Sequence, residues 1–437
     1  MDTPVDRFQE LLRIPTISRN EVELTDWAQF EAFRSALTRL YPTAHATLEL
    51  EVIAEHSLLY RWPGSGTGDP TVLMAHYDVV PATDDGWDHP AFGATIVGDD
   101  LYARGSIDNK GSLVAIFEAV ERLTAEGFTP TTDVYIFAGH NEETAGDGAE
   151  LTVAELRARD IHPALVLDEG GAIVEGVFPT VTKPAAVIGV SEKGILTLVL
   201  TVDQVGGHAS TPPRFSATAR LARAIVRLTK KPFPARMSPP TVEMVETLGA
   251  HASGALRLAF TNTRITMPLL VALFSRLSNE TSAMVRTTAA VTRLSGSAGS
   301  NVLAESATAA VNIRVAVGSS VAQAIAHVRR AVRDDLVTIS VEESSEPSPI
   351  SPTAGPAWQL LSRTIVEVFP GTVVTPYIQL GASDSRHFTA ISDNVYRFTP
   401  FELSAAQRGA LHARNENITI ATWLRGIDFY EKLVRAL

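Results

Sequence analysis

Two titratable side chains stand two residues apart where an apolar run of the chain ends. His76 and Asp78 follow Val72 to Ala75 in the string AHYDVVP. Taken alone, such a pair is more often a simple hydrogen-bonded pair than a metal site. An imidazole can, however, bind a cation through one ring nitrogen while a nearby carboxylate accepts a hydrogen bond from the other.

Six further acids or histidines follow apolar runs or precede amphipathic stretches: Asp108, Glu142, Glu143, Asp168, Glu169 and His412. Each has an ordinary explanation, since carboxylates suit the first turn or the N-cap of a helix and a lone histidine is often a surface residue. Two hydrolytic metal ions about 3.5–4 Å apart need a bridging carboxylate, an imidazole for each ion and a free carboxylate that takes a proton from water. The combined set meets that requirement.

Composition narrows the alternatives. The 437 residues carry a formal charge of -12, which argues against a surface that binds nucleic acid. The chain has no cysteine, so a metal must be held by histidine and carboxylates. The first residues lack a signal-peptide pattern, and the apolar stretch 267–274 is too short to cross a bilayer. We therefore expect a cytoplasmic protein with no membrane or nucleic-acid partner.

The first 187 residues alternate short apolar runs with amphipathic stretches, which predicts an α/β domain. Strands are expected at 71–75, 133–138 and 164–167, and a helix from Asn109 that stops before Gly127. Acids or a histidine follow each strand. Ligand crevices of open α/β sheets lie beyond the carboxyl ends of the strands, so these side chains are expected to meet there.

Residues 188–345 read as a ferredoxin-like βαββαβ unit, inserted as a lid between catalytic segments 1–187 and 346–437. The expected elements are strands 196–202, 284–291, 308–317 and 337–341, with helices 217–228 and 321–336. An apolar segment, about 231–282, interrupts the unit. We expect it to form a helical hairpin that packs on the lid or on a second subunit, with an acyl-binding wall as the alternative. Helices 358–368 and 420–437 complete the first domain.

Seven ordered strings carry a resemblance: AHYDVVP, RGSIDNKG, GHNEETAG, LDEGG, GGHASTPP, GASDSRHF and LHARNENI. The chain resembles the di-zinc metallopeptidase family of carboxypeptidase G, carboxypeptidase S, aminoacylase-1, acetylornithine deacetylase and succinyl-diaminopimelate desuccinylase. Asp168 and the string SEKG point to the carboxypeptidase S (Gly-Xaa carboxypeptidase) branch. The implied fold is a catalytic domain with a central mixed sheet flanked by helices, plus the lid.

The resemblance also implies the cofactor and the role of each residue. Two zinc ions, replaceable by cobalt or manganese, are expected. Their ligands would be His76 and Asp168 for the first ion, Glu143 and His412 for the second, and Asp108 as the bridge. Glu142 would be the general base, and Asp78 would accept the remaining ring N–H of His76. A cis peptide is expected between Asp108 and Asn109.

The lid is expected to recognise the substrate. Alternation in strand 308–317 puts Arg314 on the open face of the sheet, where a guanidinium suits a carboxylate. By resemblance, Asn301 would reach the substrate carboxylate and His208 the scissile carbonyl. In relatives these residues often act from the neighbouring subunit, so a homodimer formed through the lid is an open possibility. Gly381, Ala382 and Ser383 would offer backbone and hydroxyl donors.

These observations predict a zinc-dependent amidohydrolase or carboxypeptidase that cleaves the amide bond to a C-terminal amino acid, in a small peptide or an N-acyl amino acid. Two rivals stay open. A catalytically inactive binding protein on this fold should have lost Glu142 or a ligand, and none is lost. A phosphoesterase could use the same two metals.

Overall fold

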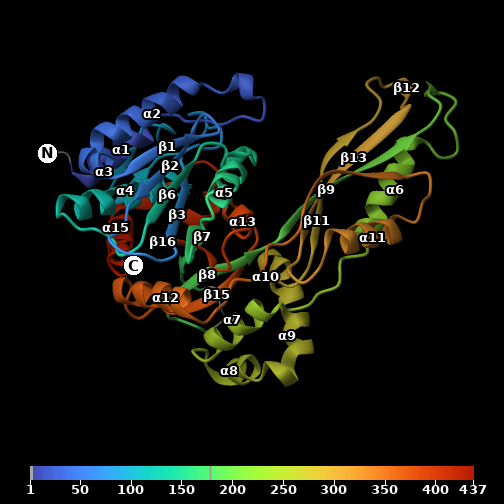
Figure 1. Ribbon diagram of the computed structural model, residues 1–437. Helices are drawn as coiled ribbons and strands as arrows, with labels where there is room; N and C mark the ends of the chain where they lie inside the picture. Colours follow the sequence, from blue (N-terminus) through green and yellow to red (C-terminus); the bar gives the residue numbers. More distant parts are fainter. Residues whose placement is uncertain (1–2, 177–179) are drawn as a thin grey trace.

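The computed structural model describes residues 3–176 and 180–437. They form a large body built on a mixed sheet and an elongated lid that projects from it (Figure 1). Eight described strands make the large sheet. In their order across the sheet they are β1 (Glu49–Ile53), β2 (Ser57–Trp62), β6 (Val134–Gly139), β3 (Thr71–His76), β7 (Leu165–Val174), β16 (Val395–Glu402), β8 (Ala185–Glu192) and β15 (Val373–Gln379).

Alternating side chains of the central strands fill two cores, one on each face of the sheet. In β3, Leu73 and Ala75 belong to one core, and Val72 and Met74 to the other. The first core lies under α1 (Pro4–Leu12), α2 (Trp27–Leu40), α3 (Pro42–Thr47), α4 (Lys110–Ala125), α12 (Pro356–Val368) and α15 (Ile420–Arg435). The second lies under α5 (Gly148–Ala158) and α13 (Ser385–Phe388). The predicted α/β fold is therefore confirmed.

The strands that should carry the functional residues run in the same direction. β3 pairs in parallel with β6 and with β7, and β16 pairs in parallel with β7. Their carboxyl ends therefore share one edge of the sheet, as the sequence predicted. The helical turn η2 (Glu142–Thr144) follows β6 at this edge, and α4 begins at the cis peptide between Asp108 and Asn109.

The lid has the predicted ferredoxin-like order of elements. Its sheet runs β11 (Thr288–Ser295), β13 (Ser306–Val315), β9 (Gly194–Asp203), β14 (Thr338–Ser345), and it is covered by α6 (Ala217–Thr229) and α11 (Val321–Val332). The chain passes from large sheet to lid at Lys193, because β8 belongs to the large sheet over its whole length. The strand register places one residue of each lid strand side by side: Ile195, Thr288, Arg314 and Ser345. All four lid strands therefore meet the large body at the same end of the lid.

The segment inserted in the lid does not pack where the sequence analysis expected. It folds into α7 (Pro239–Gly249), α8 (Gly254–Thr261), α9 (Thr263–Leu277) and α10 (Asn279–Met284). The helices α7 and α9 contribute Met244, Leu248 and Phe274 to the core of the large body, so the expected packing on the lid is wrong, and packing on a second subunit stays a prediction. Because α10 reaches Met284, strand β11 also begins four residues later than predicted.

Smaller elements complete the structure. β10 (Gly207–His208) pairs with β12 (Val302–Leu303), and β17 (Asn417–Thr419), β5 (Asp100–Tyr102) and β4 (Thr95–Val97) form a three-stranded sheet. The remaining short helices are η1 (Val22–Leu24) and α14 (Ala405–Gly409). Among the described residues no single helix has the length and apolar composition of a membrane span, although α8 and α9, bent by 113° at their junction, pass that test as a pair.

Candidate metal centre

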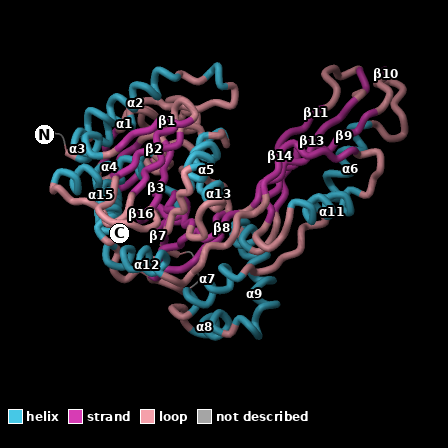
Figure 2. The backbone as a smooth tube through the Cα atoms, in the orientation of Figure 1, coloured by secondary structure: helices cyan, strands magenta, loops and turns pink. Residues whose placement is uncertain are grey.

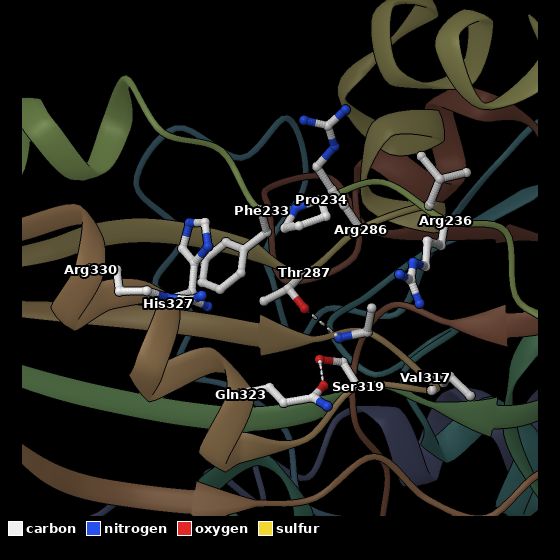
Figure 3. Close-up of a pocket in the computed structure, with 13 residues that line it drawn as sticks. Phe233, Pro234, Arg236, Arg286, Thr287, Val317, Ser319, Gln323, His327 and Arg330 are labelled. Carbon is white, nitrogen blue, oxygen red and sulfur yellow. Dashed lines mark hydrogen bonds between the residues drawn. The ribbon is translucent and has the colours of Figure 1, made fainter. Parts of the chain in front are cut away.

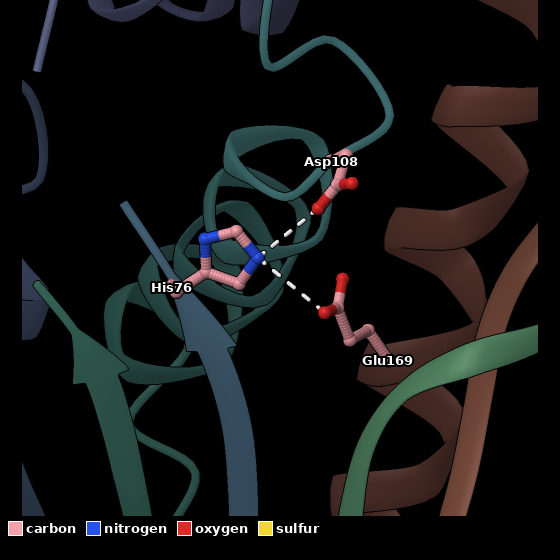
Figure 4. Close-up of side chains that lie close together, drawn as sticks. All are labelled: His76, Asp108 and Glu169. Atoms are coloured by element: carbon pink, nitrogen blue, oxygen red, sulfur yellow. Dashed lines mark hydrogen bonds and ion pairs between the residues drawn. The ribbon is translucent and has the colours of Figure 1, made fainter. Parts of the chain in front are cut away.

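The first group of potential metal ligands lies at the carboxyl end of β3. Nε2 of His76 lies 3.1 Å from Oδ1 of Asp108 and 3.4 Å from Oε1 of Glu169. Figure 4 shows both carboxylates directed at the same ring nitrogen. One nitrogen and two oxygens facing a common point form a ligand set that suits a divalent cation.

A second group shares Asp108 with the first. Nε2 of His412 lies 2.9 Å from Oδ2 of Asp108 and 3.0 Å from Oε2 of Glu143. The two oxygens of Asp108 therefore face different imidazoles, which is the arrangement of a carboxylate that bridges two cations. The structure thus brings together His76, Asp108, Glu143 and His412.

Asp78 contacts residues of both ligand groups and fixes their positions. Nδ1 of His76 lies 3.0 Å from the backbone oxygen of Asp78 and 3.3 Å from its Oδ1. The same carboxylate accepts backbone N–H groups of Glu142 at 3.3 Å and Glu143 at 3.1 Å, and the hydroxyl of Ser18 at 2.6 Å. Asp78 is fully buried, so it fixes the turn after β6 as well as the ring of His76.

The structure places Glu169 of β7, next to the predicted Asp168, in the first ligand group, and the role of Asp168 as a ligand stays a prediction. The carboxylate of Asp168 is buried and accepts the backbone N–H of Ser385 at 3.0 Å. Asp168 pairs with Arg397 of β16, whereas the next pair joins Gly171 and Phe398, so the residues between them form a bulge. The bulge directs Glu169 toward His76, and Gly170 completes it with φ +140°, in a region that favours glycine.

The pKa values of the residues in the two ligand groups indicate whether divalent cations suit this site. Burial raises the pKa of Glu169 to about 8, and the neighbouring charge of Asp108 adds to the rise. Hydrogen bonds to Asp108 and Glu143 raise the pKa of His412 to about 10. Among the described residues, Oε1 of Glu143 is buried without a hydrogen-bond partner. Bound protons thus offset the repulsion among the closely spaced carboxylates, and divalent cations can take the place of these protons.

Glu142 stands beside the first group without belonging to it. Its Oε2 lies 4.0 Å from Nε2 of His76. Burial raises the pKa of Glu142 well above its usual value; His76 lowers it, while Glu169 and Asp384 raise it further. A carboxylate next to a cation site but outside its ligand set can exchange a proton with water or substrate.

Arg314 lies near the junction of lid and large body, within a group of positive charges. Its Nε donates to Oδ1 of Asn312 at 3.2 Å. Burial lowers the pKa of Arg314; Glu343 raises it and the charge of Arg386 lowers it. Burial also lowers the pKa of Lys193 to about 8, and Arg314 contributes to that shift. Arg314 was predicted from the sequence, whereas Lys193 and Arg386 were not, although they lie in the strings SEKG and GASDSRHF.

The loop before α13 contains Gly381, Ala382 and Ser383, which were predicted to offer hydrogen-bond donors to the substrate. The backbone N–H of Ser383 donates to Oε2 of Glu192 at 2.9 Å, and its hydroxyl lies 2.7 Å from that of Ser385. Ser383 is buried and its backbone N–H is engaged within the protein, while the role of its hydroxyl toward a substrate stays a prediction. Gly381 is exposed and Ala382 half-buried, and their role stays a prediction.

His208 and Asn301 lie at the far end of the lid. His208 forms β10 and pairs with Val302 of β12, next to Asn301. Figure 1 and Figure 2 show this end of the lid pointing away from the large body. Within one chain the structure therefore does not bring either residue to the metal ligands. Both side chains are exposed.

A separate cavity of about 370 Å³ lies on the helical side of the lid, near the junction. Phe233 and His327 stack there with ring centroids 4.1 Å apart (Figure 3). Arg236, Arg286 and Arg330 also line it, but Figure 3 shows Arg286 extending away from the ring stack. The cavity is lined by none of the metal ligands, and its arginines do not converge on one point.

Known proteins share this sequence and this fold. Residues 72–436 match the model of peptidase family M20/M25/M40. The chain is 35% identical to a probable carboxypeptidase S-like 2 from Dictyostelium discoideum (98% of this chain, 84% of the relative), and 34% identical to the mouse N-fatty-acyl-amino acid synthase/hydrolase PM20D1 (97% and 86%). The M20 family metallo-carboxypeptidase Sso-CP2 from Sulfolobus solfataricus superimposes with a TM-score of 0.71 over 100% of this chain and 99% of that one, at 18% identity. The ligand groups, the family match and the full-length relatives agree, and the chain is a metallohydrolase of peptidase family M20/M25/M40.

Proposed function

We propose that this enzyme uses two zinc ions to hydrolyse the amide bond between an acyl group and an amino acid with a free carboxylate. The observation that carries the proposal is the pair of ligand groups joined by Asp108, with Glu142 4.0 Å from His76. The names of the relatives support amide substrates that end in an amino acid, either peptides or N-acyl amino acids.

The chemistry divides between the cations and the chain. Bound zinc supplies Lewis acidity, which polarises the scissile carbonyl and lowers the pKa of water. The Glu142 carboxylate accepts the proton of the attacking water and returns it to the nitrogen of the leaving amino acid. Arg314, with Lys193 and Arg386 nearby, holds the carboxylate of that amino acid.

An apolar pocket beside the ligands supports N-acyl amino acids as substrates. It has a volume of about 150 Å³ and begins at Gly170, next to Glu169, and at Leu411, next to His412. Its other large or apolar lining residues are Ala172, Val174, Val187, Met284, Tyr377 and Leu403, and Glu280, Gln379 and Arg408 add polar groups. Met284 ends the inserted segment, so the acyl-wall alternative for this segment is part of the proposal.

A substrate panel tests the function. Purified enzyme with added zinc, cobalt or manganese would be offered N-acetyl, N-lauroyl and N-oleoyl amino acids, dipeptides, and a chromogenic phosphate ester. We expect amide hydrolysis, faster with the longer acyl chains than with acetyl. Hydrolysis of the phosphate ester without amide hydrolysis would replace the proposal with the phosphoesterase alternative.

Arg314→Ala is expected to reduce kcat/KM about 10- to 100-fold, because a charge-assisted bidentate contact contributes roughly 1.5–3 kcal/mol. Amidating the carboxylate of the substrate should have a similar effect on the wild-type enzyme and little further effect on the variant. Arg293→Ala is the matched control, since Arg293 is exposed on the neighbouring strand and pairs with Glu342. Equal rates for free-acid and amidated substrates would remove the carboxylate contact from the proposal.

A dimer in which one lid serves the partner's metal centre would account for the position of His208. Mixing inactive Glu142→Gln protein with inactive His208→Ala protein should then restore roughly a quarter of the wild-type rate, because half of the dimers are mixed and each has one intact site. The measurement is hydrolysis after subunit exchange. Exchange without recovered activity would show that His208 acts within its own chain or not at all.

A further inference from the structure

Two of the inserted helices, α8 and α9, carry basic residues and no acid. From Thr247 to Asn279 the sequence contains Arg257, Arg264 and Arg276 but no aspartate or glutamate, in a chain whose net charge is -12. The flanking helices α7 and α10 carry Glu243, Glu246 and Glu280. The positive charge is therefore local to α8 and α9, and a local basic cluster attracts anions.

The same helices expose large apolar side chains. Leu258 of α8 is 68% exposed, and Ile265 and Leu269 of α9 are 82% and 63% exposed. Leu277, at the end of α9, is 51% exposed. We call these four side chains with the three arginines the insertion surface. Figure 1 shows α8 and α9 at the periphery of the large body, and an apolar surface of this kind indicates an interaction partner.

The insertion surface belongs to well-anchored helices. On α9 the exposed Arg264, Pro268, Ala272 and Arg276 are spaced four residues apart, and Ile265 and Leu269 lie beside them on the same side. Leu270, from the other side of α9, packs in the core of the large body. Arginines and apolar residues therefore share one outward stripe while the opposite side is fixed.

We propose that the insertion surface binds the surface of a bilayer rich in anionic phospholipid, with α8 and α9 lying along it. The 15 residues of α9 extend only about 22 Å, less than the ~30 Å hydrocarbon thickness, and the 113° bend prevents α8 from extending that path. The apolar side chains enter the boundary between headgroups and acyl chains, while the arginines contact lipid phosphates.

Charge favours lipid over a second copy of the chain. A symmetric dimer places the same patch of each subunit against the other. Here that contact would bring three arginines of one chain near three of its partner, and the nearest acids in the sequence are the flanking Glu246 and Glu280. An anionic bilayer satisfies the charge and the apolar side chains together. The proposal is independent of the proposed substrate.

The test is sedimentation of the whole protein with vesicles of phosphatidylcholine, with or without phosphatidylglycerol. We expect binding only to the anionic vesicles. Replacing Arg257, Arg264 and Arg276 with glutamine should weaken it roughly 100-fold, about fivefold for each arginine. Ile265→Asp should also abolish sedimentation. The matched controls are glutamine at the exposed Arg329 and Arg330 of α11 and at the exposed Arg333 that follows it, and Val205→Asp at a side chain that is 91% exposed on the lid.

Three outcomes would overturn the proposal. They are no sedimentation with anionic vesicles, equal sedimentation with neutral vesicles, and control variants that weaken binding as much as the insertion variants do. Analytical ultracentrifugation without lipid supplies a further check, since a dimer lost in Ile265→Asp without vesicle binding would assign the surface to a second copy. Glu142→Gln should bind vesicles like the wild type, so failure of the catalytic proposal stays distinguishable.

Discussion

Glu142→Gln is expected to keep its bound metal and lose about 10²–10⁴-fold in turnover. The amide has nearly the shape of the carboxylate but cannot accept a proton from water. Glu142 lies 4.0 Å from His76 and outside both ligand groups, so its replacement should leave the metal centre intact. Steady-state hydrolysis together with elemental analysis of the purified variant measures both effects.

The adjacent residue provides the contrast. Glu143 lies 3.0 Å from His412 and belongs to the second ligand group, so Glu143→Gln should lower metal content toward one ion per chain. Glu150→Gln, on the exposed side of α5, is a control for loss of one negative charge and should change neither property. If Glu142→Gln and Glu143→Gln lose metal to the same degree, the division between base and ligand is wrong.

Removing the metal should abolish hydrolysis, and adding zinc or cobalt should restore it, because the proposal assigns polarisation of the carbonyl to the cations. Glu169→Gln should weaken the first cation by more than the roughly 10- to 100-fold that follows loss of a hydrogen bond to a ligand. Metal titration of stripped protein, with activity followed in parallel, measures the affinity. Full activity in protein shown to be free of metal would contradict the mechanism.

Asp168→Asn is the matched control for that variant. Its side-chain oxygen can still accept the N–H of Ser385, so it should bind both cations nearly as tightly as the wild type. The opposite result, with metal lost in Asp168→Asn and kept in Glu169→Gln, would restore Asp168 as the ligand. The two variants therefore distinguish which of two adjacent residues of β7 binds the metal.

The lengths and order of the apolar runs were sufficient to predict the fold, because these runs form the buried central strands and helices. The apolar run of β3 is buried on both faces of the sheet, and α4 is buried on every side from Lys110 to Val120. The inserted segment was harder. Its apolar residues predict helices, but Met244 and Phe274 do not indicate which body they join, and that body proved to be the catalytic one.

The metal centre was likewise predicted only in part. His76, Asp108, Glu143 and His412 came from motifs at the ends of predicted elements, and the structure brings them together. The position of Glu169 beside His76 was not predicted, because a bulge interrupts the regular alternation of β7, and a bulge leaves little trace in one sequence beyond the glycines that follow. The hydrogen bond donated by the Ser383 backbone N–H depends on Glu192, which is distant in the sequence.

Because the lid joins the large body at one end, a rotation at this junction moves the opposite end of the lid the furthest. Strand β9 leaves the junction at Lys193 and runs for ten residues toward His208. At about 3.3 Å per residue this arm is about 33 Å long, so a rotation of about 20° at the junction displaces the tip by about 11 Å. Arg314 lies near the pivot and would hardly move. Such a rotation would change the reach of His208 while leaving the proposed contact between Arg314 and the substrate carboxylate almost in place.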